Sequence, residues 1–207
     1  MIVVIYKFRL AHHCASQARG MPVRVSREQA NANRERVVKT AARLFRERGF
    51  DGIGLADLMK EAGLTHGGFY RQFPSKEALL TEATGCAVSQ TSDYLAGVPA
   101  ADRAAVYLSQ EHRANPGSGC AIAALAGDVA RADAKTQAAF AAGVERLLAC
   151  VGGKEAATSG AARADAIQTL SALVGALVIA RATATGAPDL SDEVLATVRD
   201  RLADDAG

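Results

Sequence analysis

The chain has 207 residues, of which 49% are hydrophobic and 22% are charged, a balance that fits a soluble globular protein of one compact domain or of a small domain joined to a larger one. Its four cysteines, Cys14, Cys86, Cys120 and Cys150, include no CxxC pair, which excludes a zinc knuckle and a thioredoxin motif. Aromatic residues make up only 5% and tryptophan is absent, so the core must consist largely of Ala, Leu and Val, a composition that favours helices.

Charge is divided unevenly along the chain. Residues 1–80 hold 14 basic and 7 acidic residues, a net charge of +7, whereas residues 81–207 hold 10 basic and 15 acidic residues, a net charge of −5. A basic head on an acidic body predicts that the head meets a polyanion. Random variation of surface charge is the alternative.

Residues 1–25 are predicted to be a disordered tail or a start-site extension, because Met21 stands directly before the first recognisable domain segment. The apolar run at the start is too short for a membrane span, and no later stretch is expected to reach one, so no membrane partner is predicted. Without a convincing export signal, the widely spread cysteines indicate reduced thiols in a cytoplasm. His12, His13 and Cys14 could bind a metal ion, but a solvated tail is favoured and no metal site is predicted.

The first helix is predicted to begin after Ser26, because Ser26 and Gln29 have the spacing of a capping box. Its apolar face consists of Val37, Ala41, Leu44 and Phe45. Its basic face consists of Arg34, Arg36, Lys39, Arg43 and Arg46. Gly49 is expected to end the helix.

A helix-turn-helix motif is predicted over residues 54–73. The apolar stripe of its first helix consists of Leu55, Leu58, Met59 and Ala62. Gly63 ends that helix, and Thr65 is a suitable N-cap for the second one. Phe69 and Phe73, four residues apart, are expected to face inward, and Pro74 cannot comfortably continue the helix.

In such a motif the second helix lies in the DNA major groove, with its N-terminal residues at base edges. The adjacent glycines Gly67 and Gly68 would let the backbone come close to DNA or to the neighbouring helix. Side chains suited to phosphate oxygens are Tyr70, Gln72 and Lys76, and those suited to base edges are Arg71 and Gln72. A simple helical hairpin in an α-helical bundle is the alternative.

The remainder is predicted to be helical, without strand alternation or repeats. Ser75 caps a fourth helix that runs through Leu95. Further helices are predicted over residues 99–114, 120–132, 133–151, 162–185 and 191–205, with breaks at NPGSG, GGKEAATSG and GAPDL.

The segment RVVKTAARLFRERGFDGIGLADLMKEAGLTHGGFYRQFPSKEALL resembles the DNA-binding domain of the TetR/AcrR family of bacterial regulators, in detail over residues 31–90. The resemblance implies an all-α fold, with an N-terminal three-helix DNA-binding domain at residues 26–78 and a helical ligand-binding and dimerisation domain at residues 79–207. By position, it implies DNA contacts from Thr65, His66, Gly67, Tyr70, Arg71, Gln72 and Lys76.

One pair of positions departs from the family pattern. Family members often carry Thr and Ser just before the second helix, whereas Ile53 and Gly54 stand here. Gly54 can still cap the helix, but the hydroxyl contact to phosphate is lost. Two outcomes are open: a lower affinity for DNA, or a replacement contact from Arg34 or Lys39.

The last two helices form the dimer interface in this family, so the resemblance favours a homodimer over a monomer with an ordinary core helix. The stripe expected to form the interface consists of Ile167, Leu170, Val174, Leu177, Val178 and Arg181. A ligand pocket is expected between residues 95 and 180. Its candidate lining residues are Tyr107, Gln110, His112, Cys120, Phe140 and Cys150.

Cys120 is also a candidate sensor of oxidants or electrophiles. It stands at a predicted helix start, where the helix dipole lowers the pKa of a thiol. A buried, inert cysteine is the alternative.

Together these patterns predict a transcriptional regulator, most simply a repressor that an unknown small-molecule inducer releases from a palindromic operator in double-stranded DNA. No phosphate loop, HExxH or GxSxG motif is present, so neither an enzyme nor a cofactor is predicted. The rival hypothesis is a helical binding and dimerisation module with a degenerate DNA head, and activation is an alternative to repression.

Overall fold

The computed structural model describes residues 26–153 and 160–204. The predicted tail at residues 1–25, with its metal-binding alternative at residues 12–14, lies outside these residues. The described part is helical throughout and contains no strand, which confirms the predicted all-α class.

The N-terminal head consists of α1 (Arg27–Arg48), α2 (Leu55–Glu61) and the 3₁₀ helix η1 (His66–Arg71). Ser26 caps α1 by accepting the backbone N–H of Gln29 at 3.1 Å. The Gln29 amide bonds to Asn33 instead of reaching back to Ser26, so half of the expected capping box forms.

The second helix of the motif is tighter and shorter than the α-helix expected. It is a six-residue 3₁₀ helix, and Thr65 occupies its N-cap position without accepting a capping hydrogen bond. Two adjacent glycines disfavour the α-helix, and the chain between Gly63, whose φ is +70°, and Pro74 is short, which suits the 3₁₀ form.

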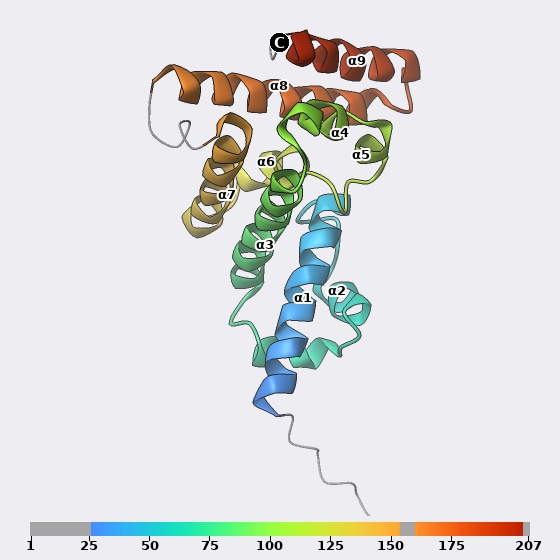
Figure 1. The fold of residues 1–207 in the computed structure, drawn as a ribbon. Helices are drawn as coiled ribbons and strands as arrows, with labels where there is room; N and C mark the ends of the chain where they lie inside the picture. Colours follow the sequence, from blue (N-terminus) through green and yellow to red (C-terminus); the bar gives the residue numbers. More distant parts are fainter. Residues whose placement is uncertain (1–25, 154–159, 205–207) are drawn as a thin grey trace, which may run out of the picture.

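The body begins with α3 (Lys76–Ala96), which is capped by Ser75 as expected. The predicted boundary between residues 78 and 79 therefore falls inside one continuous helix that links the head to the body. In Figure 1, α3 runs beside α7 (Ala134–Gly152), and α6 (Ala121–Val129) also packs against α3.

The segment predicted as one helix over residues 99–114 is divided into three short ones. These are η2 (Ala100–Asp102), α4 (Arg103–Tyr107) and α5 (Gln110–Ala114). Ser109 is in an extended conformation and its hydroxyl accepts the N–H of His112 at 3.1 Å, so a capping residue restarts the helix where continuous periodicity was expected.

Two long helices, α8 (Ala161–Thr183) and α9 (Pro188–Asp204), lie side by side at the end of the molecule opposite the head (Figure 1). The last helix begins at Pro188, three residues earlier than expected, because the fixed φ of proline suits the first position of a helix.

α8 is long and apolar enough to cross a membrane, by length and composition alone. The expectation that no stretch would reach this length was therefore wrong. Only 33% of its most apolar window is buried within the protomer, so much of its apolar surface is left uncovered.

Candidate nucleic-acid interface and pocket

One face of η1 is anchored in the core of the head and the other is open. Phe69 and Phe73 are 0% and 1% exposed and their rings stack with centroids 5.5 Å apart, as the spacing predicted. Tyr70 is 67% exposed, and His66 and Arg71 are also exposed. The anchored aromatics therefore hold a polar and aromatic surface toward solvent.

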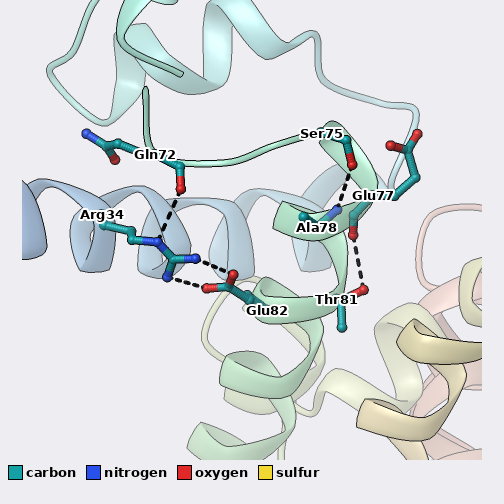
Figure 2. Close-up of polar contacts among 7 residues, drawn as sticks. All are labelled: Arg34, Gln72, Ser75, Glu77, Ala78, Thr81 and Glu82. Atoms are coloured by element: carbon teal, nitrogen blue, oxygen red, sulfur yellow. Dashed lines mark hydrogen bonds and ion pairs between the residues drawn. The ribbon is translucent and has the colours of Figure 1, made fainter. Parts of the chain in front are cut away.

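Arg34 of α1 ties the end of η1 to α3 (Figure 2). Its guanidinium makes a bidentate ion pair with Glu82, and its Nε donates to the carbonyl of Gln72 at 3.3 Å. The same group lies over the ring of Phe73, 4.6 Å from its centroid. Arg34 is thus engaged within the protein, which leaves Lys39, an exposed residue of the same helix, as the freer of the two predicted substitutes for the phosphate contact.

The two residues that depart from the family pattern have local structural roles. Ile53 is 6% exposed and belongs to the core of the head. Gly54 is the N-cap of α2, in an extended conformation and without a side chain to cap it. Lys76 is another predicted DNA contact. Its Nζ lies 3.6 Å from Oδ1 of Asp51, whose side chain is fully exposed.

The paired glycines of η1 face different surroundings. A Cβ added at Gly67 would meet nothing within 4 Å. A Cβ at Gly68 would lie 3.7 Å from Oγ1 of Thr65 and 3.9 Å from the methyl of Met59, which are ordinary contacts. Neither glycine is therefore required by packing in the described residues, and Gly67 faces open space.

In the body, a cavity of about 970 Å³ lies between the end of α3, α4 and the loop that joins α5 to α6. Three of the predicted lining residues, Tyr107, His112 and Cys120, come together in its wall. The other three, Gln110, Phe140 and Cys150, do not line it. Sequence reasoning missed the lining residues from α3 and the turn after it, among them Thr91, Tyr94, Leu95, Val98 and Pro99.

A second depression, of about 620 Å³, lies between the first turns of α3 and α7 and is lined by residues including Glu77, Glu82 and Asp133. Its walls belong to the region around the Arg34 ion pair, and none of the predicted ligand residues lies there. The 970 Å³ cavity is therefore the better candidate for a ligand site.

His112 connects two backbone segments of the cavity wall. Its Nδ1 lies 2.6 Å from the carbonyl of Tyr107, so Nδ1 carries the proton and donates it. Nε2 then accepts the backbone N–H of Cys120 at 2.8 Å. Burial lowers the pKa of His112 and favours this neutral form.

The expectation of a low thiol pKa at Cys120 was wrong. The residue is the N-cap of α6, as expected, but it is 1% exposed. Burial raises the pKa of the Cys120 thiol, and the nearby Tyr107 hydroxyl and the first N–H groups of α6 offset this only in part. Desolvation outweighs the helix dipole at this site.

The predicted dimer stripe on α8 divides between two faces. Leu170 and Leu177 are buried within the protomer, whereas Ile167 and Val178 are 45% and 42% exposed. Val174 is half-buried. Further exposed apolar side chains on α8 and α9 are Ile179 and Leu190.

Arg181, the sixth residue of that stripe, points into its own protomer. Its Nη2 donates to the carbonyl of His112 at 2.8 Å, and its Nε donates to the carbonyl of Arg113 at 3.2 Å. Arg113 in turn donates to Ser191 and Asp192 of α9, both at 2.6 Å. These bonds attach the cavity wall to the last two helices.

Sequence comparison places the head in a known group. The profile described as "Bacterial regulatory proteins, tetR family" matches residues 37–83. The chain is 43% identical over 53 residues to the uncharacterised HTH-type transcriptional regulator YerO of Bacillus subtilis, covering 26% of this chain and 18% of YerO. It is 47% identical over 45 residues to the HTH-type transcriptional repressor NemR of Escherichia coli, covering 22% of this chain and 23% of NemR. The chain thus spans about a fifth of the length of these curated relatives.

Solved structures extend the likeness to the body. The reduced form of E. coli NemR has a TM-score of 0.64 at 25% identity and covers 82% of this chain and 96% of its own. A TetR transcriptional regulator from Chloroflexus aurantiacus has a TM-score of 0.67 at 24% identity, with coverages of 85% and 94%, which shows the fold alone. These proteins are transcriptional regulators and not enzymes, in agreement with the sequence prediction. The head therefore matches the DNA-binding domain of the tetR family of bacterial regulators, and the described chain has the fold of TetR-family transcriptional regulators.

Proposed function

We propose that the chain is a cytoplasmic, ligand-responsive repressor that binds a palindromic operator as a homodimer. The observation that carries this proposal is the open face of η1, where Tyr70 is 67% exposed beside His66 and Arg71 while Phe69 and Phe73 anchor the segment. The Tyr70 ring packs edge-to-face against Phe69 and His66, and its exposed part suits contact with a DNA backbone.

The exposed apolar face of α8 and α9 supports the homodimer. Its members are Ile167, Val178, Ile179 and Leu190. An uncovered apolar face on the longest helix is typical of an interaction surface, and a second copy would supply the same face with two-fold symmetry. The two heads would then meet two operator half-sites.

Two sets of contacts link the cavity to the head and to the helices of the proposed dimer interface, and they support signal transmission between these parts. α6 has Cys120 in the cavity wall at one end, and near its other end Asp128 accepts the N–H of Phe50 in the head at 3.0 Å. On the other side, Arg181 and Arg113 join α5 to α8 and α9. A ligand that favours one position of these helices would shift the population of head spacings away from the one that fits DNA.

The proposal is tested by selecting binding sites from random double-stranded DNA with the full chain at near-physiological salt. Recovery of a palindrome bound by a dimer is the expected outcome. Recovery of no specific sequence would overturn it and favour the helical module with a degenerate head.

Substitution of the paired glycines sharpens this test. We expect Gly67→Ala to weaken operator binding at least about tenfold, because its methyl group would stand between the backbone and the DNA. Gly68→Ala is the matched control, since its Cβ would face Thr65 and Met59. Thermal unfolding should show both variants at least as stable as the parent chain. Equal operator affinity of the two variants would contradict the close approach of Gly67.

Thiol-based sensing by Cys120 is a second candidate function, favoured by the position of Cys120 in the cavity wall beside Tyr107. Because the pKa of Cys120 is raised, little of the reactive thiolate is present and the reaction should be slow in the resting protein. Because the thiol is buried, a reagent must first enter the cavity to reach it. The test is release of the selected operator by hydrogen peroxide or by a quinone, with Cys120→Ser as the variant. Release that persists in Cys120→Ser would eliminate this function.

A further inference from the structure

The 970 Å³ cavity and the wall behind it hold two buried polar groups without a hydrogen-bond partner among the described residues. One is the hydroxyl of Tyr107, a side chain that is 3% exposed and lines the cavity. It lies close to the Cys120 thiol but makes no well-formed hydrogen bond. The other is Nη1 of Arg181. A buried donor without a partner costs free energy, so the Tyr107 hydroxyl, which faces the cavity, calls for an acceptor that the protein does not supply.

Arg181 brings an unbalanced positive charge to this wall. Its other guanidinium nitrogens donate to the carbonyls of His112 and Arg113, and no carboxylate pairs with it in the described part of the chain. Gly119 of the cavity wall separates it from the cavity. A Cβ at Gly119 would lie 2.7 Å from Nη2 of Arg181, so only glycine lets the guanidinium lie this close to the wall.

The acceptors nearby are already used. Both nitrogens of His112 are engaged, one as donor to Tyr107 and one as acceptor from Cys120. The Thr91 hydroxyl donates to the carbonyl of Ala87 and accepts the N–H of Ala121, each at 3.0 Å. Rearrangement of these neighbours would therefore break existing bonds, and an external acceptor is the simpler partner.

The other residues of the cavity wall indicate which further chemical properties the ligand should have. Apolar lining is supplied by Leu95, Val98, Pro99, Ala105 and Val106. Asp102 and Glu111 lie at the rim, exposed to solvent. Rim carboxylates are screened by water and salt but disfavour ligands with several negative charges. An apolar body with a single compact anionic group fits this distribution.

We propose that this cavity binds an organic monocarboxylate, whose carboxylate accepts a hydrogen bond from the Tyr107 hydroxyl and is attracted by the positive charge of Arg181 behind the wall, while its apolar part packs against α3 and α4. The inference rests on the proposed function in that this ligand would be the effector that releases DNA. Its site adjoins Arg181 on α8 and Cys120 at the start of α6, the two places from which the signal would leave the cavity.

The test compares naphthylacetate with naphthylacetamide, which share size and shape but differ in charge, by calorimetric titration of the full chain. We expect the anion to bind at least about tenfold more tightly than the amide. In Tyr107→Phe this preference should fall several-fold, while Tyr94→Phe, a change at an exposed tyrosine of the same cavity, should leave it intact. Equal binding of anion and amide, binding of neither compound, or an unchanged preference in Tyr107→Phe would each overturn the proposal.

Thermal unfolding without ligand provides an independent measurement on the same variants. Tyr107→Phe removes a hydroxyl that has no partner, so its Tm should equal or exceed that of the parent chain. A clear fall in Tm would show that the hydroxyl is bonded within the protein and would overturn the proposal.

Operator binding by the ligand-free protein separates this inference from the proposed function. A chain that selects a palindrome but shows no preference for the anion refutes the cavity assignment alone. Selective anion binding without any selected DNA sequence refutes the proposed function and leaves the cavity assignment standing.

Discussion

His112 joins two segments of the cavity wall through the two nitrogens of one ring, and it can do so only in its neutral form. A proton on Nε2 would place two donors against each other, because Cys120 already presents its N–H there. Burial lowers the pKa of this residue from its usual value of 6.5. The stability of the folded protein should therefore depend on pH through this one residue.

We expect the free energy of unfolding to fall as the pH is lowered below 6.5. The unfolded chain takes up a proton at His112 near its usual pKa, whereas the folded chain takes it up only at the lowered pKa, so protonation favours the unfolded state throughout this window. The slope for one proton is at most about 1.4 kcal/mol per pH unit. Urea unfolding between pH 7.5 and pH 5 would measure it.

His112→Asn is the matched control, because an asparagine amide has one donor and one acceptor but does not titrate. Other groups also respond to pH, so the contribution of His112 is the difference between the two proteins. Parallel pH profiles for the parent chain and the variant would contradict the assignment.

Among the elements, α1 carries two cations with different predicted roles. Arg34 is bonded to Glu82 and to the end of η1, and Lys39 is exposed. The sequence placed both on one basic face and allowed either to contact phosphate. Packing distinguishes them, because α3 brings Glu82 to Arg34 from 48 residues away.

We expect Arg34→Met to lower stability by about 0.5–1 kcal/mol, the range for a partly exposed ion pair, and to weaken DNA binding without changing its salt dependence. Arg34 positions η1 and does not itself contact phosphate. Its loss should therefore change the affinity for DNA without changing the number of counterions that binding releases. Lys39→Met should leave stability unchanged and reduce the slope of log K against log salt by about 0.9, as expected for one lost phosphate contact.

Operator titrations at several salt concentrations, with urea unfolding of the same variants, measure both effects. A reduced salt slope in Arg34→Met would show that Arg34 reaches phosphate in the complex. An unchanged slope in Lys39→Met would remove Lys39 from the DNA interface.

For the whole molecule, Figure 1 shows α8 and α9 at the end far from the head, and these two helices carry the exposed apolar side chains Ile167, Val178, Ile179 and Leu190. A dimer formed there would hold two heads on the same side, as a palindrome requires. Leu170 and Leu177 are buried within the protomer, so the exposed residues of the stripe, Ile167 and Val178, are the ones available to contact a second copy.

Val178→Glu is expected to convert a dimer into a monomer, because it would bury two unpaired carboxylates across a two-fold interface. Operator affinity should fall by at least about a hundredfold, since each head would bind alone. Ala138→Glu adds the same charge on the exposed surface of α7 and should leave both properties intact. Sedimentation velocity and operator titration check the two outcomes, and a dimeric Val178→Glu would place the interface elsewhere.

Much of the fold and part of the site followed from local patterns. Helical periodicity and capping residues predicted most helices, and the spacing of Phe69 and Phe73 predicted which face of η1 is buried. The division of residues 99–114 was missed, because a capping serine inside a periodic segment competes with continuation of the helix. Half of the predicted pocket residues lie together in the wall of the 970 Å³ cavity and half do not, since sequence spacing cannot say which helix ends meet.

The sequence by itself determined the all-α class and the likeness of the head to the tetR family, because amphipathic spacing, caps and the head motif are local properties of the chain. Only the tertiary structure decided three further matters: that Arg34 serves an ion pair, that Ile167 and Val178 remain exposed while Leu170 does not, and that the Cys120 thiol has a raised pKa. Each depends on which distant segment packs against the residue, since desolvation and ion pairing arise from neighbours that the sequence order does not reveal.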